Sequence, residues 1–127
     1  MKGFDLTQLS PSSVKSVRLT KPTDYEALLK NGWRFGSRSF LARALNNAGQ
    51  GPRLGLIVGK KMAPRSVDRN RVKRLVRIVH RHFAADFQQL DLVVQLRSGP
   101  RDRDNLTLFK ELHGLMLGVL NQSVNRA

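Results

Sequence analysis

The feature that most constrains the fold is a stretch near the middle of the chain, Ser66 to Phe83, where apolar residues repeat with the period of an α-helix. On a helical wheel with a step of ~100° per residue, four apolar side chains fall within ~60° of Val72. They are Leu75, Val76, Val79 and Phe83. The pattern predicts an amphipathic helix with one narrow apolar stripe, which must be buried against other elements. Asp68 falls in the first turn, where the helix dipole favours an acidic side chain.

The opposite side of this predicted helix is basic. Its outward positions are Asn70, Lys73, Arg74, Arg77 and Arg81, while Arg69 and Arg71 flank the stripe. Residues 60–82 hold nine Lys or Arg and one Asp, so less than a fifth of the chain carries more than half of its net charge of +14. Like charges three or four residues apart repel, whereas a merely solvated face normally mixes signs. We therefore interpret this face as a binding surface for a polyanion.

The rest of the chain predicts the elements that would bury the stripe. Residues 21–32 read as a short helix with Thr23 as its N-cap and Gly32 just past its end. Residues 33–45 alternate like a strand, either continuous or broken at Gly36, and a turn at 46–52 leads to a strand at 53–60 that we expect to complete a hairpin. A buried strand at 90–98 and a helix at 105–120 follow.

Length and element order together predict one domain. A chain of 127 residues suits a single domain. The expected architecture is α+β, with a mixed sheet of about four strands packed with three helices. We expect residues 1–17 to form a loosely ordered N-terminal arm and residues 18–127 to form the domain.

Several function classes are excluded or disfavoured by residue content. The chain has no cysteine, which excludes disulfides, a thiol nucleophile and a cysteine zinc site. No apolar run reaches the ~18 residues of a membrane span, and no signal peptide is recognisable, so we expect a cytoplasmic protein. No paired carboxylates or metal-ligand cluster is visible, so no catalytic or metal-binding residue is predicted. We expect His80, His82 and His113 at the surface or at helix ends, and the phenylalanines in the core, namely Phe35, Phe40, Phe83, Phe87 and Phe109.

One stretch matches a known family in register. An apolar strand from Leu54 ends in Lys60-Lys61, and a short basic loop leads to Arg69-Asn70-Arg71, Lys73-Arg74 and Arg77. This pattern resembles the protein subunit of bacterial ribonuclease P. Asp24-Tyr25 followed by Gly32 resembles the family's first helix, and Asp91 to Val94 its last strand. The resemblance covers roughly residues 17 to 120.

The resemblance implies a fold and a function. The family has one α+β domain with an unusual left-handed βαβ crossover, against the usual right-handed rule. Its RNA subunit, with bound Mg²⁺, removes the 5′ leader from precursor tRNA. The protein broadens substrate recognition and lowers the Mg²⁺ requirement, is inactive alone, binds no metal itself, and requires neither a membrane nor a protein partner.

The resemblance also implies site residues. The RNA-binding set carried over is Lys60, Lys61, Arg65, Arg69, Asn70, Arg71, Lys73, Arg74 and Arg77. A cleft between the first helix and the sheet would hold the single-stranded leader through Tyr25, Leu29 and Arg43, of which the last two stand where relatives commonly have aromatic residues. Because Arg69 and Arg71 flank the stripe, we expect them to reach toward this cleft.

Three other functions compete with this interpretation. A structural RNA-binding protein, such as a small ribosomal protein, has the same composition, and only the Arg-Asn-Arg register argues against it. A double-stranded DNA reader of the helix-turn-helix type needs a second helix just upstream, whereas a strand precedes this helix. Binding to a membrane surface needs apolar side chains available to lipid, and the core requires those of Leu75, Val76 and Val79.

Overall fold

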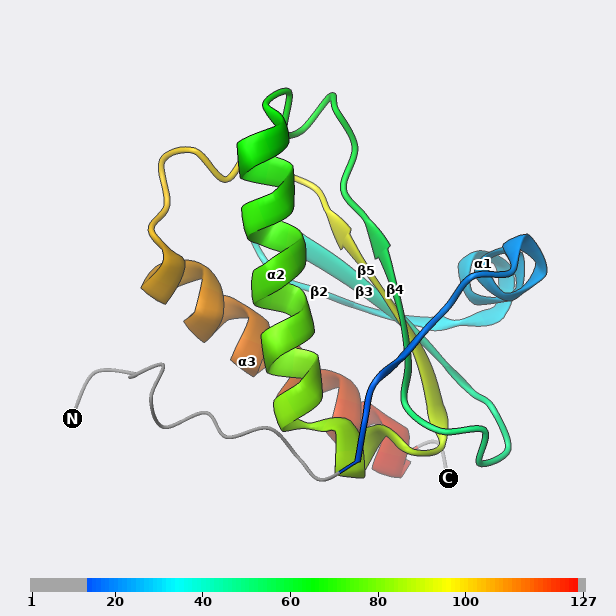
Figure 1. Ribbon diagram of the computed structural model, residues 1–127. Coiled ribbons are helices and arrows are strands. Elements are labelled where there is room, and N and C mark those ends of the chain that lie inside the picture. Colours follow the sequence, from blue (N-terminus) through cyan, green and yellow to red (C-terminus); the bar gives the residue numbers. More distant parts are fainter. Residues whose placement is uncertain (1–13, 126–127) are drawn as a thin grey trace, which may run out of the picture.

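The computed structural model describes residues 14–125 as one five-stranded mixed sheet with three α-helices (Figure 1). The elements in chain order are β1 (Val17–Arg18), α1 (Pro22–Asn31), β2 (Trp33–Gly36), β3 (Phe40–Asn46), β4 (Arg53–Ile57), α2 (Ser66–His82), the short 3₁₀ helix η2 (Ala84–Phe87), β5 (Leu90–Leu96) and α3 (Asn105–Asn125). The predicted α+β class and the three helices are confirmed. The sheet has five strands because residues 33–45 split in two and β1 adds a short edge strand.

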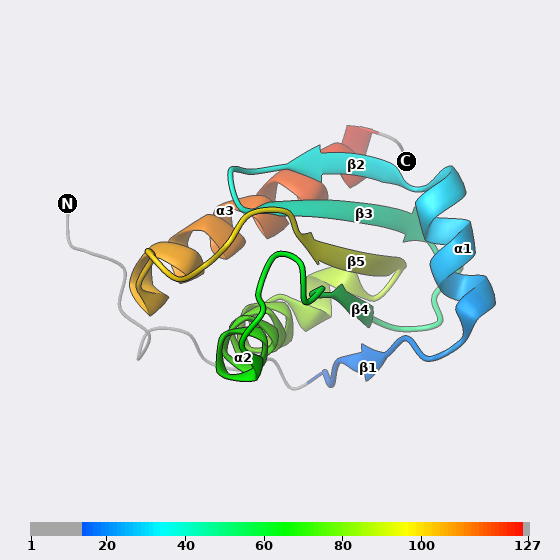
Figure 2. The same cartoon turned by 90° about the horizontal axis from the view of Figure 1, so that it is seen from above.

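The strands lie in the order β1-β4-β5-β3-β2, as Figure 2 shows from above. β4 and β5 are parallel neighbours joined by α2, and β3 is antiparallel to both β5 and β2. The predicted hairpin between residues 33–45 and 53–60 is therefore wrong, because β5 lies between β3 and β4. Nearly every residue of β5 is buried, and a strand buried on both faces belongs in the middle of a sheet. The actual hairpin joins β2 to β3.

The apolar stripe of α2 is buried as predicted. Val72, Val76 and Val79 are fully buried and Leu75 nearly so, in one core with β3, β5 and α3. Figure 1 shows α2 and α3 on the same side of the sheet. The phenylalanine prediction is confirmed for four buried rings, Phe40, Phe83, Phe87 and Phe109, while Phe35 is half-buried and packs against this core.

The opposite face of the sheet carries α1. Leu28 is fully buried against Leu19 and Val93 in a second, smaller core. The N-cap is Lys21 rather than the predicted Thr23, because Pro22 takes the first helical position, to which its fixed φ is suited. Gly32 ends α1 as expected, although its backbone is extended. A Cβ at Gly32 would lie 2.6 Å from the Leu28 carbonyl oxygen, so close packing requires the glycine.

The N-terminal segment is described from Val14 onward. Val17, which we placed in the arm, pairs with Arg53 as part of β1. Residues 1–13 of the predicted arm lie outside the described residues. Ser16 Oγ lies 2.7 Å from Nδ1 of His80, which connects this segment to the last turn of α2.

His80 lies in the last turn of α2, at the predicted helix end, but it is not at the surface. Its ring is fully buried and lies 5.4 Å from the ring of Phe87, measured between centroids. Burial disfavours the charged imidazolium and lowers the pKa of His80 to about 4. His82 ends α2 as expected, and His113 is half-buried in α3.

We predict that His80 makes folding stability fall in mild acid. Its pKa is lower in the folded protein than in the unfolded chain, so the unfolded state binds the extra proton first. The contribution of His80 to the free energy of unfolding is therefore fully present above the ordinary histidine pKa and is lost as the pH falls toward 4. Over that range the free energy of unfolding should fall by up to about 1.4 kcal/mol per pH unit. Urea unfolding of the wild type and of His80→Gln across this range measures the difference. The lowered pKa of His113 is present in both proteins and cancels. Parallel pH profiles for the two proteins would contradict the assignment.

Candidate nucleic-acid interface

The outer surface of α2 and of the turn before it presents free basic side chains. Lys60 and Lys61 are exposed in the turn between β4 and α2, and Asn70, Arg74 and Arg77 are exposed along the helix. Within residues 14–125, none of these cations forms a salt bridge with an acidic residue. The helical wheel therefore placed the basic face correctly. Such a surface attracts polyanions and leaves its N–H donors available to phosphate oxygens.

Arg65 belongs to the predicted set but has a partner inside the protein. Its Nε lies 2.9 Å from Asp68 Oδ2, and its Nη2 lies 3.2 Å from Oδ1. This hydrogen-bonded guanidinium holds the pKa of the Asp68 carboxyl below its ordinary value. The Arg65 side chain remains half-exposed. It can thus contact an anion while its charge is partly balanced by Asp68.

Arg69 and Arg71 point into loops of the protein. Nη1 of Arg69 donates to the carbonyl oxygens of Ala63 and Pro64, in the loop before α2. Arg71 donates from Nη1 to Arg103 O and Asn105 Oδ1 and from Nη2 to Pro100 O, all in or beside the loop between β5 and α3. The expectation that the two arginines reach toward the leader cleft is therefore wrong. Each instead fixes the shape of a loop beside the N-terminal half of α2.

We predict that Arg71→Ala loosens the loop at residues 98–105 without unfolding the domain. The substitution leaves three acceptors without their charged donor, which costs about 1–3 kcal/mol. Hydrogen exchange at the loop amides should accelerate, and the urea midpoint should fall. Arg74→Ala is the matched control, because Arg74 is exposed on the same helix, and surface substitutions of this kind usually stay within about 0.5 kcal/mol. Unchanged loop exchange in Arg71→Ala would show that the hydrogen bonds do not hold the loop.

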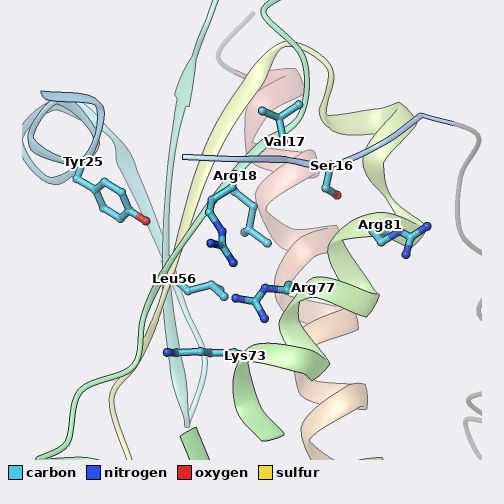
Figure 3. Close-up of a pocket in the computed structure, with 9 residues that line it drawn as sticks. Ser16, Val17, Arg18, Tyr25, Leu56, Lys73, Arg77 and Arg81 are labelled. Atoms are coloured by element: carbon cyan, nitrogen blue, oxygen red, sulfur yellow. The ribbon is translucent and has the colours of Figure 1, made fainter. Parts of the chain in front are cut away.

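A groove of about 490 Å³ lies between the N-terminal strand and the outer side of α2 (Figure 3). It is lined by Ser16, Val17, Arg18, Tyr25, Leu54, Leu56, Lys73, Arg77 and Arg81. Three of these, Tyr25, Lys73 and Arg77, were in the predicted RNA-binding or leader sets. Arg18 and Arg81 were not, and the sequence shows no periodic relation between β1 and α2 that would have connected them. No acidic residue lines the groove.

The three predicted leader residues do not meet in this groove. Tyr25 packs so closely on β4 that a Cβ at Gly55 would lie 2.8 Å from its ring. Gly55, Val93 and Arg43 are register partners on neighbouring strands, so they share the face of the sheet that carries α1. Arg43 donates from Nη1 to Gln95 Oε1 at 2.9 Å, and Leu29 on α1 is 46 % exposed. Tyr25 and Arg43 therefore lie on one sheet face, and only Tyr25 also borders the groove.

The described residues show neither a metal site nor a membrane-spanning helix. Residues 14–125 include no group of three His, Asp or Glu side chains placed to hold a metal ion. In the same part of the chain, no helix is both long and apolar enough to cross a membrane. The fold and the charged surface together define a class, namely a small α+β protein with a basic helical face suited to a polyanion.

Comparisons with known proteins identify the family. The family model "Ribonuclease P" matches residues 14–119. The chain is 34 % identical over 122 residues to the ribonuclease P protein component of Nitrosococcus oceani, covering 96 % of this chain and 97 % of that one. The Staphylococcus aureus RNase P protein structure superposes with a TM-score of 0.75 at 26 % identity, covering 83 % of this chain and 96 % of that one. A second structure, of an S. aureus mutant with defective mRNA degradation activity, gives 0.74 at 26 % identity and covers 80 % and 86 % of the two chains. The chain belongs to the family of ribonuclease P protein components.

Proposed function

We propose that this chain is the RNA-binding subunit of ribonuclease P and acts in the cytoplasm. It would bind a catalytic RNA subunit and precursor tRNA, and the RNA would remove the 5′ leader. Family membership supports this role. The observation that carries it is the row of cations on α2 and the preceding turn that lack acidic partners within residues 14–125.

Docking to the RNA subunit would use the side chains that face outward. Of the predicted set, the exposed members are Lys60, Lys61, Arg65, Asn70, Arg74 and Arg77. An arginine fork suits two phosphate oxygens at once, and Asn70 can reach a phosphate or a 2′-hydroxyl. Arg69 and Arg71 would contribute by fixing the loops on either side. Binding releases counterions from the RNA, so affinity should fall steeply with salt.

Mg²⁺ would belong to the RNA. In the described residues, no acidic or histidine cluster is placed to hold a metal, and the strong positive charge of α2 disfavours a second cation nearby. When bound to the RNA, Mg²⁺ supplies the activated water and stabilises developing charge. The protein's own cations would screen phosphates that Mg²⁺ must otherwise neutralise, which would lower the Mg²⁺ requirement.

The leader would lie on the sheet face beside α1. One side of the Tyr25 ring rests on Gly55, and the ring is only half-buried. A base can stack on such an aromatic platform without regard to its identity. Leu29 would pack against a base, and Arg43 would pair with a phosphate.

Reconstitution with the cognate RNA subunit tests the function. At low Mg²⁺ we expect the RNA alone to cleave precursor tRNA slowly, and addition of the protein to restore rapid cleavage at the mature 5′ end. The protein alone should cleave neither precursor tRNA nor mRNA, because its described residues hold no cluster that could bind a catalytic metal ion. No stimulation by the protein, or nuclease activity of the purified protein alone, would refute the proposal.

We predict that Tyr25→Ala weakens binding of precursor tRNA to the holoenzyme by roughly 5- to 150-fold, the equivalent of one lost base stack. Affinity for mature tRNA, which lacks the leader, should hardly change. Tyr25→Phe is the control, because it keeps the ring and removes only a hydroxyl with a long 3.4 Å contact to Leu19 O. If Tyr25→Ala lowers both affinities equally, or melts the domain, the residue is structural.

A further inference from the structure

The groove between β1 and α2 concentrates positive charge from two elements that are far apart in the sequence. Arg18 comes from β1, while Lys73 and Arg77 come from α2, and in Figure 3 all three point into the same space. Arg81 and Ser16 lie at the far end of the groove. None of the four cations has an acidic partner among residues 14–125. Their mutual repulsion favours the binding of an anion in the groove.

The cationic wall of the groove suits the phosphates of a nucleic-acid strand, and its apolar floor suits the bases. Lys73, Arg77 and Arg81 follow each other every four residues, which separates them by about 6 Å along the helix axis. A row of evenly spaced cations suits a row of phosphates. The floor is apolar, with Leu54 and Leu56 from β4 and Val17 from β1, and the Tyr25 ring closes one side. The groove has a volume of about 490 Å³, and an unpaired strand can present both its phosphates and its bases to such a lining.

Tyr25 connects this groove to the sheet face beside α1. Its ring rests on Gly55 of β4 and also lines the groove. β1 pairs with β4 only at Arg53 and Leu54. The edge of β4 at Leu56 is therefore not covered by β1. A strand that leaves the sheet face at Tyr25 can therefore pass around β4 into the groove without crossing β1.

We propose that this groove binds the upstream part of the precursor tRNA leader through its phosphates. The inference rests on the proposed function, and it extends the leader path from the sheet face beside α1, past Tyr25, to the outer side of α2. Arg18 and Arg81 become leader-binding residues. Lys73 and Arg77, which the family resemblance assigned to docking on the RNA subunit, also line this groove and would contact the leader as well.

The test uses the holoenzyme and a nested series of precursor tRNAs that differ only in leader length. The double variant Arg18→Ala/Arg81→Ala should bind long-leader precursors about 3- to 30-fold more weakly, as expected for two partly exposed ion pairs. Precursors whose leaders are too short to extend beyond Tyr25 should bind to the double variant as tightly as they bind to the wild type. The slope of log affinity against log salt should fall by about 0.7 per removed cation for long leaders only.

Two matched variants separate the alternatives. Arg74→Ala removes a cation on the same helix that does not line the groove, so it should weaken RNA-subunit assembly equally at every leader length. Lys110→Ala, an exposed cation on α3, should change nothing. If the double variant loses affinity equally for all leaders, the groove binds the RNA subunit and the inference is wrong. No loss at any length overturns it too. Either result leaves the proposed function intact as long as the wild-type holoenzyme cleaves precursor tRNA.

Discussion

Burial of one apolar stripe on α2 determines where the rest of the molecule can present charge. Val72, Leu75, Val76 and Val79 dock the helix on the sheet, and burying such side chains contributes about 1.5–3 kcal/mol each. That gain offsets the repulsion among basic residues three and four positions apart, which costs only a few tenths of a kcal/mol per pair. Because α2 joins the parallel neighbours β4 and β5, docking also fixes its direction. Its first turn then lies beside the basic loop, and its outer side faces β1.

β4 contacts elements on both faces of the sheet and so connects α2 to α1. Leu54 points into the core under α2, whereas Gly55 accepts the Tyr25 ring of α1 directly on its backbone. Arg53, next to both, donates from Nε and Nη2 to the Asp91 carboxylate at 2.6 Å and lies 3.6 Å from Asp24 on α1. Its hydrogen bond with Asp91 raises the pKa of the Arg53 guanidinium. This cluster joins α1, β4 and β5, so the aromatic ring and the basic helix keep a fixed separation across one strand.

Local periodicity was readable from the sequence, and long-range pairing was not. The stripe, the outward basic positions and the three helices follow from local spacing and from capping residues, and the buried phenylalanines follow from the usual burial of aromatic side chains. β5 lies between β3 and β4 because the central position of a sheet goes to the strand with the most apolar surface to bury. That choice depends on a comparison of all the strands, so no local sequence pattern shows it. The helix-end position of His80 was predicted, but its burial was not, because it sits at the edge of the stripe, where η2 and the segment around Ser16 cover it. The groove was missed because Arg18 and Arg77 meet only through the pairing of β1 with β4.

The basic residues of this domain fall into two groups that a count of charge cannot distinguish. The first group donates hydrogen bonds to carboxylates or loop carbonyl oxygens within the protein, and its members are Arg53, Arg65, Arg69 and Arg71. Lys60, Lys61, Arg74 and Arg77 have no acidic partner among residues 14–125. Both groups contribute to the long-range field that attracts a polyanion, but only the second can offer all of its N–H donors to phosphates. The Arg-Asn-Arg segment thus combines both functions in three residues. Its two arginines shape the surface, while Asn70 between them and the free cations around it stay exposed to solvent.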